Sequence, residues 1–245
     1  MAKSGLKLTD YGSTKERESS PIIPDQAIDS GTGQPEIAWA GISLAIYTGL
    51  LTPMITEAVE SEAKREGKES SSNDQLMLSM YAMVCLGIGE IVGSLTIGRI
   101  IDKMGNKVCS LITLALIAIQ TLLTVWFIYS WTFGPLVFAM TFVWGLQDSV
   151  VNTHMSEVLG FEFEDNTRPF SVFNIVQSIT VFCFLVVEAY VNTRSQYYSF
   201  NILCGILGML MCGLMFFFPY THDDPKGHQE LEEEQSERHT HSAIN

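Results

Sequence analysis

Basic residues are scarce in this chain. Its 245 residues include 14 Lys and Arg against 27 Asp and Glu, and the formal net charge is −13. Proteins that bind nucleic acid need clustered Lys and Arg to neutralise phosphates, so this balance argues against nucleic acid as a partner. Most of the acidic charge falls in three polar regions, residues 57–74, residues 157–165 and the tail from Asp223 onward.

Several other features are missing. No Asn-x-Ser/Thr sequon occurs, so glycosylation gives no clue to sidedness. The first 35 residues lack the apolar core of a cleavable signal peptide, and we expect the first apolar stretch to act as the insertion signal. The cysteines show no CxxC or Cys/His metal spacing and are expected to be apolar packing residues. They are Cys85, Cys109, Cys183, Cys204 and Cys212.

The residue patterns of common enzymes are also missing. The sequence contains no Walker loop, no metal-ligand cluster and no Ser/His/Asp arrangement on soluble elements. We therefore expect no catalytic residues, no metal site, no cofactor and no enzymatic activity.

What the chain does contain is six long apolar stretches. A bilayer core of about 30 Å needs roughly 20 mostly apolar residues per helix, and each stretch meets that length. They cover residues 37–59, 75–101, 108–130, 133–159, 170–191 and 198–219. The sequence thus predicts an all-α, multi-pass integral membrane protein with six transmembrane helices. Its domains are a polar tail (1–36), the transmembrane domain (37–219) and an acidic, flexible tail (220–245). Plasma membrane, endomembrane and mitochondrial inner membrane all stay open.

The distribution of Lys and Arg predicts the orientation. With six spans both termini lie on one side, which receives ten basic residues while the other receives four. We therefore expect both termini on the inner side. The ten are Lys3, Lys7, Lys15, Arg17, Arg99, Lys103, Lys107, Arg168, Lys226 and Arg238; the four are Lys64, Arg65, Lys68 and Arg194.

Small residues at four-residue spacing predict helix contacts. Gly41, Ala45 and Gly49 share one face of the first span, and Gly89 and Gly93 share one face of the second. Such faces let backbones approach closely in lipid. The alternative is that glycine is simply common in transmembrane helices.

Carboxylates inside apolar spans are the candidate functional groups. Glu90 lies within the second span, and Asp148 lies in the fourth on the same helical face as Asn152. A second half-polar stripe in the fifth span includes Asn174 and Gln177. Intramembrane carboxylates usually face a bundle interior or a watery cavity. Each is a candidate proton or cation site, or a hydrogen-bonded contact between packed helices.

Three more ionisable residues lie nearer the ends of spans. His154 is expected at the inner interface, in contact with water, rather than in a proton relay. Glu57 and Glu188 sit close to the outer boundary and are expected to reach water.

A basic loop joins the second and third spans. It reads Gly98-x-x-x-Asp102-Lys103-x-Gly105-x-Lys107. Gly105 permits the chain to reverse, and Asp102 is placed to cap the next helix or to pair with a cation. This pattern resembles the cytoplasmic loop motif of the major facilitator superfamily.

A second stretch narrows the resemblance. Residues 144–154 read Trp-Gly-Leu-Gln-Asp-Ser-Val-Val-Asn-Thr-His, and residues 168–178 read Arg-Pro-Phe-Ser-Val-Phe-Asn-Ile-Val-Gln-Ser. These stretches resemble the C-terminal half of the ion-channel-regulatory (uncoordinated-93-like) branch, where Gly-Leu-Gly-Asp, Asn-Thr-Gln and Phe-x-x-Phe-x-x-x-Gln-Ser are typical. This chain departs from that series at Gln147 and His154.

The resemblance implies a half bundle of the major facilitator type, since that superfamily pairs two six-helix halves. Members of the resembled branch include regulators and adaptors of other membrane proteins. We therefore expect a structural or regulatory component of a larger membrane assembly, bound to other subunits. The alternative is half of a solute or proton-coupled transporter, completed by a second six-helix unit or by homodimerisation.

Overall fold

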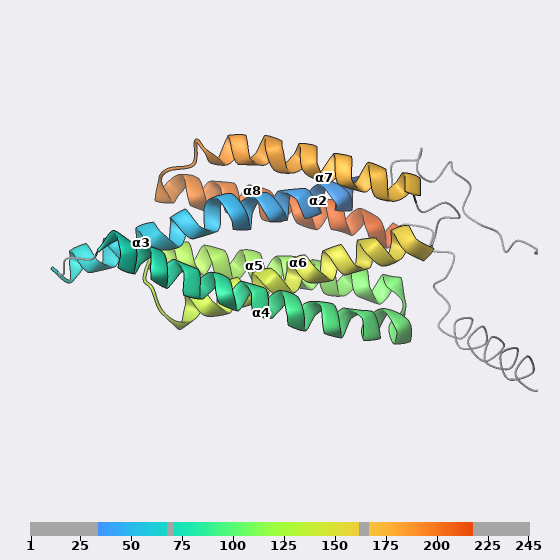
Figure 1. Cartoon of the computed structure of the whole chain (residues 1–245), viewed down its shortest axis with the longest axis horizontal. Coiled ribbons are helices and arrows are strands. Elements are labelled where there is room, and N and C mark those ends of the chain that lie inside the picture. Colours follow the sequence, from blue (N-terminus) through green and yellow to red (C-terminus); the bar gives the residue numbers. More distant parts are fainter. Residues whose placement is uncertain (1–33, 68–70, 162–166, 218–245) are drawn as a thin grey trace, which may run out of the picture.

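In the computed structural model, which describes residues 34–67, 71–161 and 167–217, every secondary-structure element is helical. The helices are α2 (Gln34–Ala45), the π-helical turn η1 (Ile46–Leu50), α3 (Leu51–Arg65), α4 (Ser72–Met104), α5 (Asn106–Ser130), α6 (Pro135–Phe161), α7 (Thr167–Glu188), α8 (Arg194–Leu214) and the 3₁₀ turn η2 (Met215–Phe217). α2, η1 and α3 form one continuous rod (Figure 1).

Five helices are long and apolar enough to cross a membrane: Pro35–Arg65, Ser72–Met104, Asn106–Ser130, Thr167–Glu188 and Arg194–Phe217. They correspond to five of the six predicted spans. α6 corresponds to the other and has 27 residues, about 40 Å at 1.5 Å per residue. It carries Gln147, Asp148 and Asn152 in its middle, so it is more polar there. Six spans with the termini inside therefore remain a prediction.

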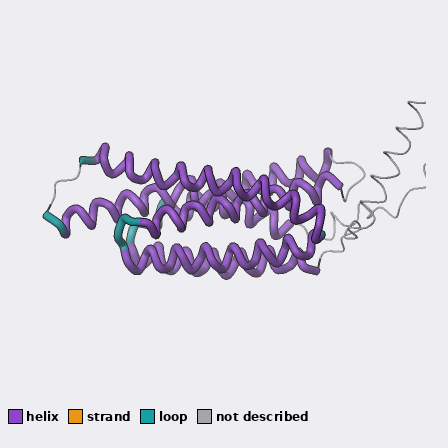
Figure 2. The backbone as a smooth tube through the Cα atoms, turned by 90° about the horizontal axis from the view of Figure 1, so that it is seen from below, coloured by secondary structure: helices purple, strands orange, loops and turns teal. Residues whose placement is uncertain are grey.

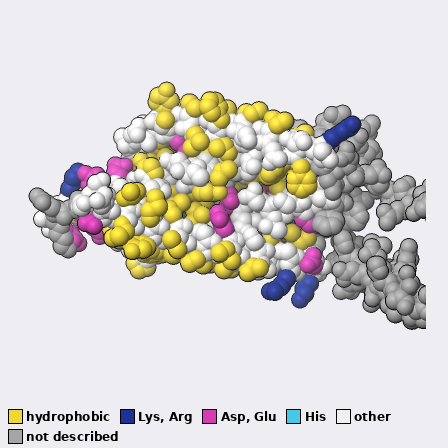
Figure 3. All heavy atoms as spheres, viewed as in Figure 1, with side chains coloured by type: hydrophobic (Ala, Val, Ile, Leu, Met, Phe, Trp, Pro, Cys, Tyr) yellow, Lys and Arg dark blue, Asp and Glu magenta, His cyan; other side chains and the backbone are white. Residues whose placement is uncertain are grey.

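The helices run side by side along one long axis (Figures 1 and 2). α4, α6, the α2–α3 rod and α7 form the near layer in Figure 1, and α5 and α8 lie behind them in contact with each other. α2 begins and α8 ends at the same end of the bundle. Bulky apolar side chains are exposed on the face seen in Figure 3 and on α4, α5, α7 and α8, as a lipid-facing surface requires. Examples are Ile91 and Leu95 on α4, Leu122 on α5, Phe182 on α7 and Leu210 on α8.

Glycines bring the helices of two pairs into close contact. A Cβ atom at Gly89 of α4 would overlap the carbonyl oxygen of Phe142 of α6, and one at Gly93 would lie 2.9 Å from that of Leu146. On the α2–α3 rod, a Cβ at Gly41 would lie 2.8 Å from the carbonyl oxygen of Gln177 of α7. The predicted contact role of Gly41, Gly89 and Gly93 is confirmed. Gly145 of α6, which the sequence did not single out, has the same role toward Leu86.

Two arginines cap the C-terminal end of α5, where free carbonyl groups carry partial negative charge. Arg194 donates from Nε to the carbonyl oxygen of Ile128 at 2.6 Å and lies 5.5 Å from the centre of the Trp131 ring. Arg65 donates to the carbonyl oxygen of Trp131 at 2.8 Å. Trp131 itself is left-handed (φ 49°), a conformation common just past a helix end.

The polar segments differ in part from the prediction. Residues 57–74 were expected to form a solvated loop, but helix α3 continues through the first part of it to Arg65. Glu62 explains this, because its Oε2 accepts a hydrogen bond at 2.7 Å from the backbone N–H of Phe133 in the α5–α6 connection. Likewise α6 extends to Phe161, into the second predicted polar region. Of the predicted tails, residues 1–36 and 220–245, all but residues 34–36 lie outside the described residues, and those three already belong to helix α2.

Candidate functional site: an acidic pocket between three helices

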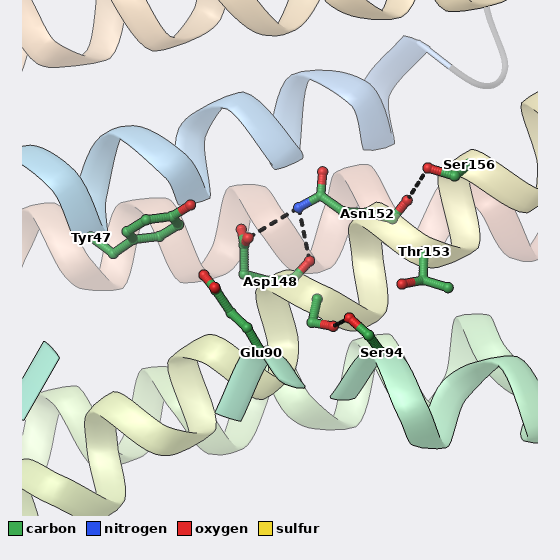
Figure 4. A pocket seen from close by; sticks show the side chains of 8 residues that line it. Tyr47, Glu90, Ser94, Asp148, Asn152, Thr153 and Ser156 are labelled. Atoms are coloured by element: carbon green, nitrogen blue, oxygen red, sulfur yellow. Dashed lines mark hydrogen bonds between the residues drawn. The ribbon is translucent and has the colours of Figure 1, made fainter. Parts of the chain in front are cut away.

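A polar pocket of about 440 Å³ opens on the near face of the bundle, between η1, α4 and α6 (Figure 4). Its volume falls in the range of small-molecule sites, about 300–1,000 Å³. It is lined by Tyr47, Glu90, Ser94, Asp148, Ser149, Asn152, Thr153 and Ser156.

Asp148 is the most buried acidic group of the pocket, with 5% of its surface exposed. Its Oδ2 accepts a hydrogen bond from the side-chain amide of Asn152 at 3.0 Å, one helical turn along α6. Its Oδ1 is buried and makes no hydrogen bond of its own. The hydroxyl groups of Ser43 and Tyr47 lie beside this carboxyl group. Asp148 therefore keeps one carboxylate oxygen with acceptor capacity to spare, closed off from the open part of the pocket.

Glu90 approaches Asp148 from α4. The two carboxyl groups lie near one another in Figure 4, that of Asp148 directed toward Asn152, and are close enough for their charges to interact. Below them the hydroxyls of Ser94 and Ser149 share a hydrogen bond of 2.7 Å between α4 and α6. Glu90 reaches this position because Gly89 and Gly145 let the two backbones touch.

Tyr47 enters the pocket from the π-helical turn. A π-turn inserts one extra residue into a helix, shifts the side chains that follow, and often occurs at functional sites. The hydroxyl of Thr48 supports the turn by donating to the carbonyl oxygens of Leu44 at 2.6 Å and Ala45 at 3.2 Å. The Tyr47 hydroxyl points toward Asp148 (Figure 4).

Three of the five predicted polar site residues meet in this pocket: Glu90, Asp148 and Asn152. The other two do not. Asn174 is exposed on α7, and the backbone of Gln177 packs on Gly41 of α2. Tyr47 and the serines were not predicted, because a hydroxyl in an apolar span carries no pattern that marks it, and a π-turn has no clear sequence signal.

The predicted loop motif forms the tight α4–α5 turn. Gly105 has φ 81°, a value that favours glycine, and its N–H bonds to the carbonyl oxygen of Ile101 at 2.9 Å. The expected reversal at Gly105 is confirmed. The expected cap by Asp102 is wrong, because Gly105 occupies the N-cap position of α5 and no side chain caps it. Asp102 and Lys103 are exposed, as is Lys107 on the first turn of α5, and Gly98 has open space around its Cα.

A second polar contact joins α2 to α6 outside the pocket. His154, expected at the water interface, is instead fully buried, with its Nδ1 at 3.2 Å from Oε1 of Glu36. Seven residues away on both helices, the hydroxyl of Ser43 donates to Oε1 of Gln147 at 3.5 Å. The two residues of α6 that depart from the resembled pattern thus both make polar contacts with α2.

The two glutamates predicted to reach water at the outer boundary differ in their exposure. Glu57 is exposed, as expected, whereas Glu188 is 5% exposed and lies against Gly49, with neither carboxyl oxygen hydrogen bonded. The prediction for Glu188 was wrong because the glycine of η1 leaves room for the carboxyl group between the helices. Of the cysteines, Cys109, Cys204 and Cys212 are buried as expected, and Cys183 is exposed on α7.

The described residues contain no group of three or more His, Cys, Asp or Glu side chains placed to hold a metal ion. What the pocket offers chemically is two carboxyl groups, several hydroxyls and an amide, all facing an open cavity within a membrane-length bundle. Such a set binds and releases a polar or charged species.

The helix lengths and apolar outer surface define an integral, multi-pass membrane protein. A family model described as Major Facilitator Superfamily matches residues 36–243, and the chain belongs to that superfamily. No curated protein and no solved structure matches the chain.

Proposed function

We propose that this domain is one half of a transporter of the major facilitator type, in which the pocket face meets a second six-helix unit. Major facilitator proteins pair two six-helix halves around a site near the middle of the membrane. The observation that carries the proposal is the open pocket between η1, α4 and α6, with buried Asp148 inside it. A polar face of this kind is costly against lipid, and a second unit would enclose it.

In this proposal the second unit is a further six-helix segment or a second copy of this one, and the protein is not an enzyme. Glu90, Asp148 and Asn152 line the solute pathway, and the lipid-facing surface is the outer wall. Asn174 is exposed on α7 and Gln177 packs its backbone on Gly41 of α2, so neither lines the pathway.

A second candidate is a structural or regulatory subunit, in keeping with the resemblance to the uncoordinated-93-like branch. The observation that favours it is that several polar groups of the pocket already bond one another. Asn152 bonds Asp148, and Ser94 bonds Ser149. Side chains held in this way would suit a fixed contact with another membrane protein.

Native mass spectrometry of the protein, purified from its own membrane in nanodiscs, separates these candidates. The transporter proposal predicts twelve transmembrane helices in the smallest stable unit, as a dimer, a pair of different chains or one longer chain. A large assembly of fixed stoichiometry would support the structural candidate. A stable unit with only these six helices would contradict both.

A further inference from the structure

The pocket has a single sign of charge. Two of its eight lining residues, Glu90 and Asp148, carry carboxyl groups, and none of the eight is Lys, Arg or His. The two carboxyl groups come from different helices and lie near one another. When both are ionised they repel each other, and a positive charge placed between them removes that repulsion.

The pocket also has unused hydrogen-bond acceptors. Asp148 is about nineteen-twentieths buried, yet its Oδ1 makes no hydrogen bond. The hydroxyl groups of Ser43 and Tyr47 lie beside this carboxyl group, and Oδ1 is closed off from the open cavity. A buried acceptor without a donor costs free energy, which a donor on a bound ligand recovers once the carboxyl group turns toward the cavity. The neighbouring hydroxyls of Ser94, Thr153 and Ser156 accept as well as donate, so the lining suits a ligand with several N–H groups.

The size of the pocket and its aromatic wall favour an organic cation over a bare metal ion. A volume of about 440 Å³ far exceeds the space a single ion needs. In the described part of the chain no third carboxylate, His or Cys joins the pair as a metal ligand. Tyr47 adds an aromatic ring beside the carboxyl groups, and aromatic faces attract ammonium ions.

We propose that the pocket between η1, α4 and α6 binds a protonated amine, with its ammonium group between Glu90 and Asp148 and its apolar part beside Tyr47. This inference rests on the proposed function, since it takes the pocket as a solute site. It names the class of solute: small organic cations with N–H donors.

The test measures binding of phenethylamine to the purified, intact protein in nanodiscs by isothermal titration calorimetry at neutral pH. The neutral analogue 2-phenylethanol, the anion 3-phenylpropanoate and the quaternary trimethyl ammonium analogue serve as ligand controls. We expect phenethylamine to bind roughly tenfold or more tightly than each, because only phenethylamine combines a positive charge with N–H donors, and charge-assisted hydrogen bonds are about twice as strong as neutral ones.

Variants assign the binding to the two carboxyl groups. Asp148→Asn and Glu90→Gln should each weaken phenethylamine binding roughly tenfold or more, while Glu188→Gln, which removes a buried carboxyl group outside the pocket, should leave it unchanged. Glu90 is half-buried, so its variant keeps the test valid if Asp148→Asn fails to fold.

Three results would overturn the inference. The first is equal affinity for phenethylamine and 2-phenylethanol. The second is a loss of phenethylamine affinity in Glu188→Gln equal to that in the two pocket variants, and the third is a heat of binding with Na⁺ or K⁺ but none with the amine. The result of this binding assay does not depend on how many subunits the purified protein contains. If a stable unit with only six helices still bound the amine through its carboxyl groups, the binding site would stand, and the proposal that the domain is half of a transporter would be refuted.

Discussion

Gly145→Ala is expected to push α4 and α6 apart and to destabilise the protein by roughly 3 kcal/mol, the upper range for overpacking a tight contact. A Cβ atom at this position would overlap the carbonyl oxygen of Leu86 and lie 3.0 Å from the backbone nitrogen of Glu90. Backbone atoms cannot rotate away as a side chain does, so the helices themselves must move. Gly89 of α4 lies against the carbonyl oxygen of Phe142 of α6, so Gly89→Ala should have an effect of the same size.

Gly87→Ala is the matched control, because it lies on α4 two residues from Gly89 and a Cβ there meets nothing within 4 Å. It should be neutral or slightly stabilising, since alanine favours a helix over glycine by up to about 1 kcal/mol. Thermal unfolding in detergent, followed by tryptophan fluorescence, measures all three variants. Equal melting temperatures for Gly145→Ala and Gly87→Ala would show that α4 and α6 do not touch as described.

Removing one partner of the buried Glu36–His154 contact is expected to cost about 3 kcal/mol. Both side chains are at most 1% exposed, and removing one partner of a buried polar pair is strongly destabilising. Glu36→Ala and His154→Ala should therefore each lower the unfolding temperature strongly. The double variant Glu36→Met/His154→Leu should recover much of the loss, because apolar side chains of similar volume often replace a buried pair without penalty.

The matched comparison is the exposed pair on α3. Glu60 and Lys64 are 2.6 Å apart, but their side chains are 45% and 74% exposed. Solvent screens such a pair, and Glu60→Ala should change stability by less than about 0.5 kcal/mol. Equal effects of Glu36→Ala and Glu60→Ala, or a double variant no more stable than the single ones, would contradict the burial of the Glu36–His154 contact.

Much of the helical layout could be predicted from the sequence, because length and hydropathy are local properties. The α4–α5 turn was predictable for the same reason, since Gly105 adopts a positive φ that other residues rarely accept. Gly41, Gly89 and Gly93 were predictable as contacts because they repeat at helical spacing. Gly145 has no glycine or alanine four residues away, only Thr141 and Ser149, and was not singled out.

The pocket could be predicted only in part. Glu90, Asp148 and Asn152 stood out because charged and amide groups are rare in apolar spans. Which helix faces which cannot be inferred from one helix alone, so Asn174 and Gln177 were grouped with them although they lie on α7. The Glu36–His154 contact joins residues 118 apart in sequence. Glu36 also stands at the start of the first span, where a glutamate ordinarily indicates solvent.

The central claim is that the pocket face meets a second six-helix unit, and site-specific photo-cross-linking in the native membrane tests it most directly. A benzophenone amino acid is placed at Ser156, exposed at the pocket, or at Leu122, which is 68% exposed on α5 and does not line the pocket. We predict a cross-link to a second six-helix unit from Ser156 and none from Leu122. Protein cross-links from Leu122, with none from Ser156, would place the contact away from the pocket and contradict the claim.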